Sequence, residues 1–128
     1  MKIAVVIRNW NGVQHLQHYL PRVVATTADA DIVVADNGSN DGSVEWLHSE
    51  MPSVRRLLLG QNFGFAEGYN RAIAQVDADY IVLLNSDVEV TQGWLSTMLA
   101  YLDTHPEDQR ALCLHRKYVK ELKDLKLL

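Results

Sequence analysis

Short apolar runs alternate with longer segments of helical periodicity in residues 1–104. Each apolar run has the length of one buried strand, and the runs cover residues 3–7, 32–35, 54–59 and 80–84. The segments between and after them carry apolar side chains at helical spacing, within residues 16–24, 44–47, 66–74 and 94–102. Continuous rather than alternating apolar strands, separated by helices, predict an α/β fold with a mainly parallel sheet and helices on both faces.

Polar side chains gather where each predicted strand ends. The clusters are residues 8–12, 36–43, 60–64 and 85–87. Ligands of open α/β sheets bind beyond the carboxyl ends of the strands, so these clusters predict one shared crevice. Within the second cluster, the Ser43 hydroxyl is also predicted to cap the helix that follows.

The turn after the last strand carries the most informative pattern, Asn85-Ser86-Asp87. Carboxylate and amide oxygens at a sheet edge suit Mg²⁺ or Mn²⁺ carrying a phosphate, which makes Asp87 and Asn85 the predicted metal ligands. The alternative is an ordinary polar turn, because Asn, Ser and Asp are common turn formers.

Two of the other clusters also allow more than one interpretation. Asp36 directly follows a buried strand, where its carboxylate either accepts from a ring N–H of a base or belongs to a plain turn. Trp10 either packs in the core or lies beside a base or sugar. In the simplest interpretation, Asn9 and Asn11 satisfy backbone groups at the strand end.

Amides and glycines surround the start of the third predicted helix. Asn62 and Asn70 are candidates for binding sugar hydroxyls. Gly60, Gly64 and Gly68 match neither a phosphate-binding P-loop nor the G-x-G-x-x-G dinucleotide motif. They are predicted to serve turns and close packing.

Composition and charge narrow the choice of function. Hydrophobic residues make up 48% of the 128-residue chain and charged residues 22%, as is typical of one globular domain. The net charge of −4 argues against a nucleic-acid partner. The single cysteine, Cys113, fits a reducing compartment. No apolar run suits a signal sequence or a membrane span, which predicts a cytoplasmic protein, either free or at the inner face of the membrane.

Residues 105–128 differ from the body formed by residues 1–104. Most of the lysines lie in this tail, and its net charge is positive where that of the body is negative. Its apolar positions predict a short helix with one apolar face, formed by Tyr118, Val119, Leu122 and Leu125 and extending to Leu128. Because a short helix needs a packing surface, we expect the tail to cover an open edge of the body or to pair with a second copy.

Four motifs in residues 1–104 together resemble the N-terminal half of family 2 glycosyltransferases, and most closely the rhamnosyltransferase type. The motifs are residues 5–12, 33–43, 62–70 and 83–87. Their order and spacing make the resemblance specific, since any one alone is common. The resemblance implies a Rossmann-like half-domain of the GT-A fold.

The resemblance also implies a role for individual residues. Asp36 matches the acid that hydrogen-bonds the uracil or thymine of the donor. Asp87 matches the last acid of the DXD element, which holds a divalent cation on the diphosphate, and Asn85 replaces its first acid. The implied nucleotide-binding residues are Asn9, Trp10, Asn11, Asp36, Asn62, Gly64, Asn70 and Ser86.

The function implied is binding of a UDP- or dTDP-sugar through Mg²⁺ or Mn²⁺, for transfer to a saccharide or another acceptor. The resemblance fades after about residue 106, so we expect a truncated half-domain without the acceptor half. No acid after Asp87 lies in a recognisable general-base motif, which leaves catalysis by this chain open. The alternatives are a non-catalytic nucleotide-binding module and a receiver-like signalling domain, although the latter requires an acidic pair where this chain has residues 9–11.

Overall fold

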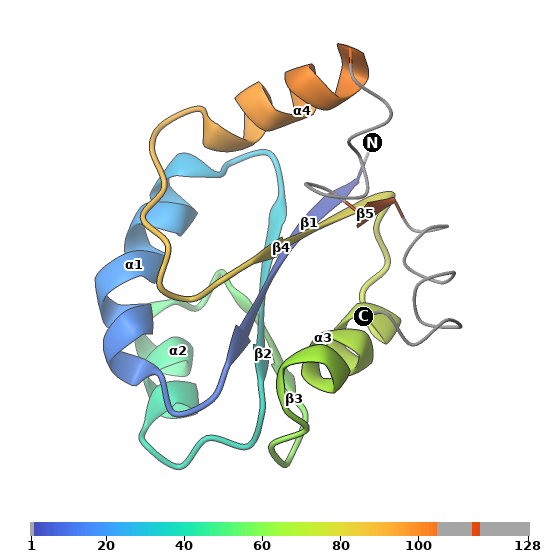
Figure 1. The fold of residues 1–128 in the computed structure, drawn as a ribbon. Coiled ribbons are helices and arrows are strands. Elements are labelled where there is room, and N and C mark those ends of the chain that lie inside the picture. The colour runs from blue at the N-terminus through green and yellow to red at the C-terminus, as the bar shows by residue number, and fades with distance from the viewer. Residues whose placement is uncertain (1, 105–113, 116–128) are drawn as a thin grey trace.

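In the computed structural model, a sheet lies between helices on both of its faces (Figure 1). The structure describes residues 2–104 and 114–115. The strands are β1 (Ile3–Asn9), β2 (Asp31–Asp36), β3 (Arg55–Leu58), β4 (Tyr80–Leu84) and β5 (Leu114–His115). The helices are α1 (Val13–Thr26), α2 (Ser43–Glu50), α3 (Phe65–Ala74) and α4 (Trp94–Thr104).

The strand order β3-β2-β1-β4-β5 confirms the predicted sheet type. Strands β1 to β4 run parallel, and β5 pairs antiparallel with β4. The central strand β1 is in register with both neighbours, since Asn9 faces Asp36 of β2 and Ile7 faces Leu84 of β4. The carboxyl ends of β1, β2 and β4 therefore lie side by side.

Two hydrophobic layers cover the faces of the sheet. Alternation along β1 sends Val5 and Ile7 into the layer with α1 and α2, and Val6 into the layer with α3. Figure 1 shows α1 and α2 on one side of the strands and α3 on the other. Helices on both faces explain why the strands are continuously apolar.

The edge strand β3 is shorter than the apolar run that predicted it. Arg55 and Arg56 are exposed there, as expected for a solvated edge. The prediction that Ser43 caps α2 is wrong. Gly42, with φ of 89°, occupies the N-cap, and Ser43 is the buried first residue of the helix.

Part of the predicted tail belongs to the sheet, because Leu114–His115 form β5 against β4. The predicted apolar helix of the tail lies outside the described residues. Within the described part of the chain, no helix is both long and apolar enough to cross a membrane. The cytoplasmic location stays a prediction.

Candidate functional site

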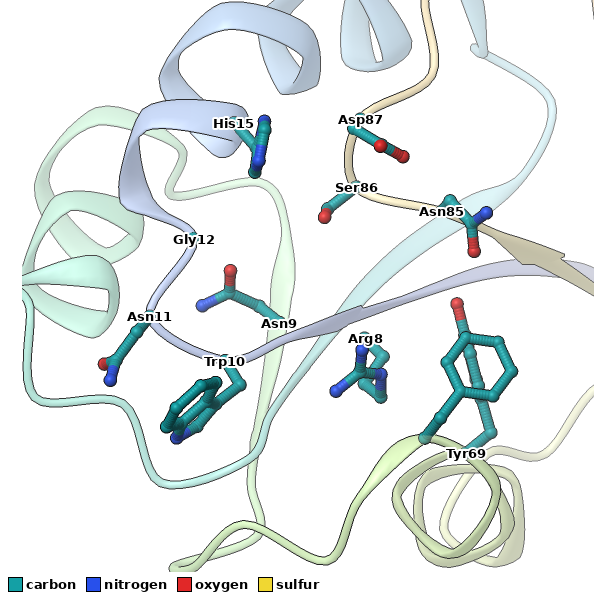
Figure 2. A pocket seen from close by; sticks show the side chains of 11 residues that line it. Arg8, Asn9, Trp10, Asn11, Gly12, His15, Tyr69, Asn85, Ser86 and Asp87 are labelled. Atoms are coloured by element: carbon teal, nitrogen blue, oxygen red, sulfur yellow. The ribbon is translucent and has the colours of Figure 1, made fainter.

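A cavity of 390 Å³ opens at the carboxyl ends of β1 and β4 (Figure 2). Its walls come from the end of β1, the starts of α1 and α3, and the turn that follows β4. The lining residues are Arg8, Asn9, Trp10, Asn11, Gly12, His15, Phe65, Tyr69, Asn85, Ser86 and Asp87.

The cavity brings together two of the predicted polar clusters. Residues 9–11 lie on one side of it and residues 85–87 on the other, although they are far apart in the sequence. The predicted residues that do not line the cavity are Asp36, Asn62, Gly64 and Asn70. Trp10 is 49% exposed, so it is not the core residue that one interpretation expected.

Asn9 carries a buried hydrogen-bond acceptor in the wall of the cavity. Its side chain is only 1% exposed, and its Nδ2 donates to Asp36 Oδ1 at 2.9 Å and to Ser39 Oγ at 3.2 Å. Among the described residues, Asn9 Oδ1 has no hydrogen-bond partner. A Cβ on Gly12 would lie 2.7 Å from this oxygen, so the glycine leaves room for it in this position. Figure 2 shows the oxygen directed toward Gly12 and His15.

Asp36 lies behind the cavity wall and orients Asn9. The carboxylate is 3% exposed, and its two oxygens accept from Asn9 Nδ2 and, at 2.8 Å, from the Ser39 N–H. The bond to Asp36, together with that to Ser39, fixes the orientation of the Asn9 carboxamide. A direct contact between Asp36 and a base stays a prediction.

The loop after β2 is joined to the start of α1 by reciprocal hydrogen bonds. The Asn11 N–H donates to Ser39 Oγ, and the Asn40 N–H donates to Asn11 Oδ1, both at 2.8 Å. Asn11 has φ of 47°, a left-handed conformation that asparagine tolerates better than most residues. The loop and β1 therefore form one fixed wall.

Asp41 stabilises the starts of two helices. It accepts from the Val13 N–H of α1 at 3.0 Å and from the Ser43 N–H of α2 at 3.0 Å, and the Ser43 hydroxyl also donates to it. Burial alone would raise the pKa of Asp41, but the hydrogen bonds from Ser43 and Val13 lower it below the usual value. The carboxylate replaces the cap that was predicted for Ser43.

Asn62 and Gly64 shape the loop before α3. Asn62 Oδ1 accepts from the Gly64 N–H at 2.9 Å, and the Gly64 carbonyl accepts from buried Asn37 Nδ2 at 3.0 Å. Gly64 has φ of 82°, a conformation that favours glycine. Asn70 lies half-buried on α3. Contacts of these residues with a sugar or nucleotide stay predictions.

Several lining residues were missed by the sequence analysis. Phe65 and Tyr69 are four residues apart on α3, and their rings meet edge to face at 5.1 Å. Tyr69 donates from its hydroxyl to the Leu84 carbonyl at 3.1 Å, and burial raises its pKa. Their helical spacing was the available signal. Arg8 belongs to the first polar cluster but was given no role of its own, and His15 gave a weaker signal as a polar residue three positions after that cluster.

The cavity has oxygen donors that fit a divalent cation. Asn85 and Asp87 both line it and both are exposed. In residues 2–104 and 114–115, no group of three or more His, Cys, Asp or Glu side chains is placed to hold a metal. Mg²⁺ usually takes one or two carboxylates and completes its shell with substrate phosphates and water, so this donor set fits a cation that binds with a phosphate ligand.

The fold and the cavity define an α/β protein whose binding site lies at the carboxyl edge of a parallel sheet. The family whose model matches is Glycosyl transferase family 2, over residues 4–125. The chain belongs to this family. The match extends beyond residue 106, where the resemblance was expected to fade.

A curated relative agrees with the family, and solved structures agree with the GT-A fold. The chain is 31% identical over 109 residues to N-acetylglucosaminyl-diphospho-decaprenol L-rhamnosyltransferase of Mycobacterium tuberculosis, covering 76% of this chain and 36% of that relative. S. aureus TarS in complex with UDP has a TM-score of 0.70 at 20% identity, covering 82% of this chain and 33% of that one.

A second solved relative is glucosyl-3-phosphoglycerate synthase of Mycobacterium tuberculosis, in complex with Mn²⁺, UDP and glucosyl-3-phosphoglycerate. It has a TM-score of 0.63 at 19% identity, covering 79% of this chain and 39% of that one. The chain thus spans between 33% and 39% of the length of these proteins. At such identities the solved structures establish the fold alone.

Proposed function

We propose that this chain binds a nucleoside diphosphate sugar in the cavity at the carboxyl edge, as the donor site of a glycosyltransferase. The observation that carries the proposal is the side-chain oxygen of Asn9, which is buried in the wall of the cavity that Asp87 also lines and has no hydrogen-bond partner among the described residues. An unpaired buried acceptor costs free energy unless a ligand donates to it. An N–H or hydroxyl of a nucleotide would supply that donor.

The diphosphate is assigned to the turn after β4. Asn85 and Asp87 would hold Mg²⁺ or Mn²⁺, and a bound divalent ion would offset the negative charge that grows on the leaving diphosphate. The exposed Trp10 at the cavity offers a flat apolar surface to a base or sugar. The solved relatives support UDP and Mn²⁺ as the ligands to test first.

Calorimetric titration with UDP, dTDP and GDP, in Mn²⁺ and in EDTA, tests the proposal. We expect one pyrimidine diphosphate to bind in Mn²⁺, with a loss of affinity of about 100-fold for Asp87→Ala. Glu89→Gln is the matched control, because Glu89 is an exposed acid two residues away that does not line the cavity. Absence of binding by all three nucleotides in both conditions would refute the donor site.

A second candidate is a module that binds the donor without transferring the sugar. One observation favours it: among the described residues that line the cavity, Asp87 is the single carboxylate, and the proposal already uses it for the metal. An inverting transfer needs a further general base. Release of nucleoside diphosphate from the donor in the presence of an acceptor saccharide would exclude this candidate.

A further inference from the structure

Arg8 is a cation placed where the apolar interior of the sheet meets the cavity. It follows Ile7 near the end of β1, and strand alternation puts its side chain on the α3 face, the face of Val6. The paired register of β1 and β4 ends at Ile7 and Leu84, so the next residues along the two strands are Arg8 and Asn85. Arg8 therefore adjoins the turn that carries Asp87, and Figure 2 shows it below Asn85.

The stem of Arg8 is held by residues of α3. A Cβ on Gly68 would lie 3.2 Å from Arg8 Cδ, so the glycine provides the space for the stem. The guanidinium carbon lies 5.2 Å from the centre of the Phe65 ring, within the range of a cation–π contact. The side chain is half-buried. These contacts restrict the guanidinium to the cavity wall before any ligand binds.

The guanidinium lacks an anionic partner in the described part of the chain. Its Nε is buried and forms no hydrogen bond there. By contrast, Arg71 on the exposed face of α3 pairs with Glu67 at 3.0 Å. A buried guanidinium donor that is left unpaired costs free energy. A phosphate is a strong partner for a guanidinium, because the planar guanidinium can donate two parallel hydrogen bonds to its oxygens.

We propose that Arg8 binds a phosphate oxygen of the nucleoside diphosphate directly, beside the divalent cation held at Asp87. This inference rests on the proposed function. The charges support it, since a nucleoside diphosphate carries more negative charge than one divalent cation offsets, and Asp87 adds to that excess. An arginine at the adjacent strand end supplies a positive charge that does not depend on the metal.

The test compares a diphosphate with its parent nucleoside. The pyrimidine diphosphate that binds best and the corresponding nucleoside are titrated, each in Mn²⁺ and in EDTA, into the unchanged chain, Arg8→Gln and Arg8→Lys. Arg56→Gln is the matched control, because Arg56 is an exposed arginine on the edge strand β3 and does not line the cavity.

We expect Arg8→Gln to weaken diphosphate binding about tenfold or more in both conditions and to leave nucleoside binding unchanged. Arg8→Lys should lose less, because it retains the charge without the planar fork. Equal affinities of Arg8→Gln and Arg56→Gln for the diphosphate would overturn the inference. Equal losses for the diphosphate and the nucleoside would also overturn it, because they would indicate a structural role.

A measurement on the unchanged chain covers the case in which Arg8→Gln does not fold. Inorganic pyrophosphate should displace the nucleoside diphosphate in EDTA, and failure to displace it would contradict a metal-independent phosphate contact. If the unchanged chain binds the nucleoside diphosphate and Arg8→Gln binds it with the same affinity, this inference alone fails. If the unchanged chain binds no nucleotide, the proposed function fails with it.

Discussion

A hollow lies at each end of the parallel strands, at the carboxyl edge and at the amino edge of the sheet. The two hollows differ in the side chains that form their walls. At the carboxyl edge, the 390 Å³ cavity lies against a network of buried polar side chains, which includes Asn9, Asp36 and Asn37. At the amino edge, a larger hollow of 520 Å³ is lined by exposed side chains such as Lys2 and Asp31.

The difference shows that volume alone does not identify a binding site in this protein. Burying polar groups costs free energy unless each is hydrogen-bonded, and such bonds hold the groups in one orientation. Polar groups are buried at the carboxyl edge in spite of this cost, and their hydrogen bonds hold the donors and acceptors in fixed positions. The exposed side chains of the amino edge are solvated and carry no such constraint.

The largest expected effect on stability comes from Asn9→Ala. The substitution removes a partner from the buried Asp36 carboxylate and leaves a void, which should lower the free energy of unfolding by about 3 kcal/mol. Thr27→Ala is the comparison near the amino edge, where a buried hydroxyl accepts from Trp94 Nε1 at 2.8 Å, and it should cost about 1 kcal/mol. Urea unfolding of both variants measures the difference. A smaller loss in the free energy of unfolding for Asn9→Ala than for Thr27→Ala would contradict the proposed difference between the two edges.

A smaller loss is expected for Asp41→Ala, which removes the acceptor at the starts of α1 and α2. The free energy of unfolding should fall by about 1–2 kcal/mol near neutral pH. Because the pKa of Asp41 is lowered in the folded state, its contribution is present above the ordinary value of 3.8 and is lost as the pH falls through the folded value. Urea unfolding across acidic pH should show the difference from the unchanged chain shrinking. A difference that is constant to pH 2 would contradict the assignment.

The smallest expected effect is that of Tyr69→Phe, which removes the hydrogen bond to the Leu84 carbonyl at the cavity wall. The loss should be about 1 kcal/mol at neutral pH. Since burial raises the pKa of Tyr69, the folded state holds this proton more tightly than the unfolded state does. The stabilisation by Tyr69 should therefore decline as the pH rises through and above 10, and Tyr69→Phe should lack that decline. Equal alkaline profiles for the two proteins would exclude this account.

Hydrophobic patterning predicted most of the fold, because it depends on which side chains are buried. The apolar run at residues 80–84 coincides with β4, and the runs for the other parallel strands differ from the structure at their ends. The antiparallel β5 was missed, because a strand of two residues is too short to give a pattern. Its pairing depends on tertiary contact with β4.

Only part of the site was predicted. Strand position indicates the edge at which a residue lies, but it does not indicate the direction of its side chain. Asn9 and Asp87 follow apolar strands, and parallel strands bring their carboxyl ends to one edge. Asp36 satisfies the same rule, yet its oxygens accept from Asn9 and Ser39 behind the wall. Strand position predicts which edge a side chain occupies, but hydrogen-bonded partners decide whether it faces the cavity.

The most direct test of the central claim is an amide NMR titration of the ¹⁵N-labelled chain with UDP and Mg²⁺. The account predicts that chemical shift changes concentrate in residues 8–12, 65–69 and 85–87, around the carboxyl-edge cavity. Residues 28–31, at the larger hollow of the amino edge, should remain unchanged. Changes centred on residues 28–31, with none around the carboxyl-edge cavity, would contradict it.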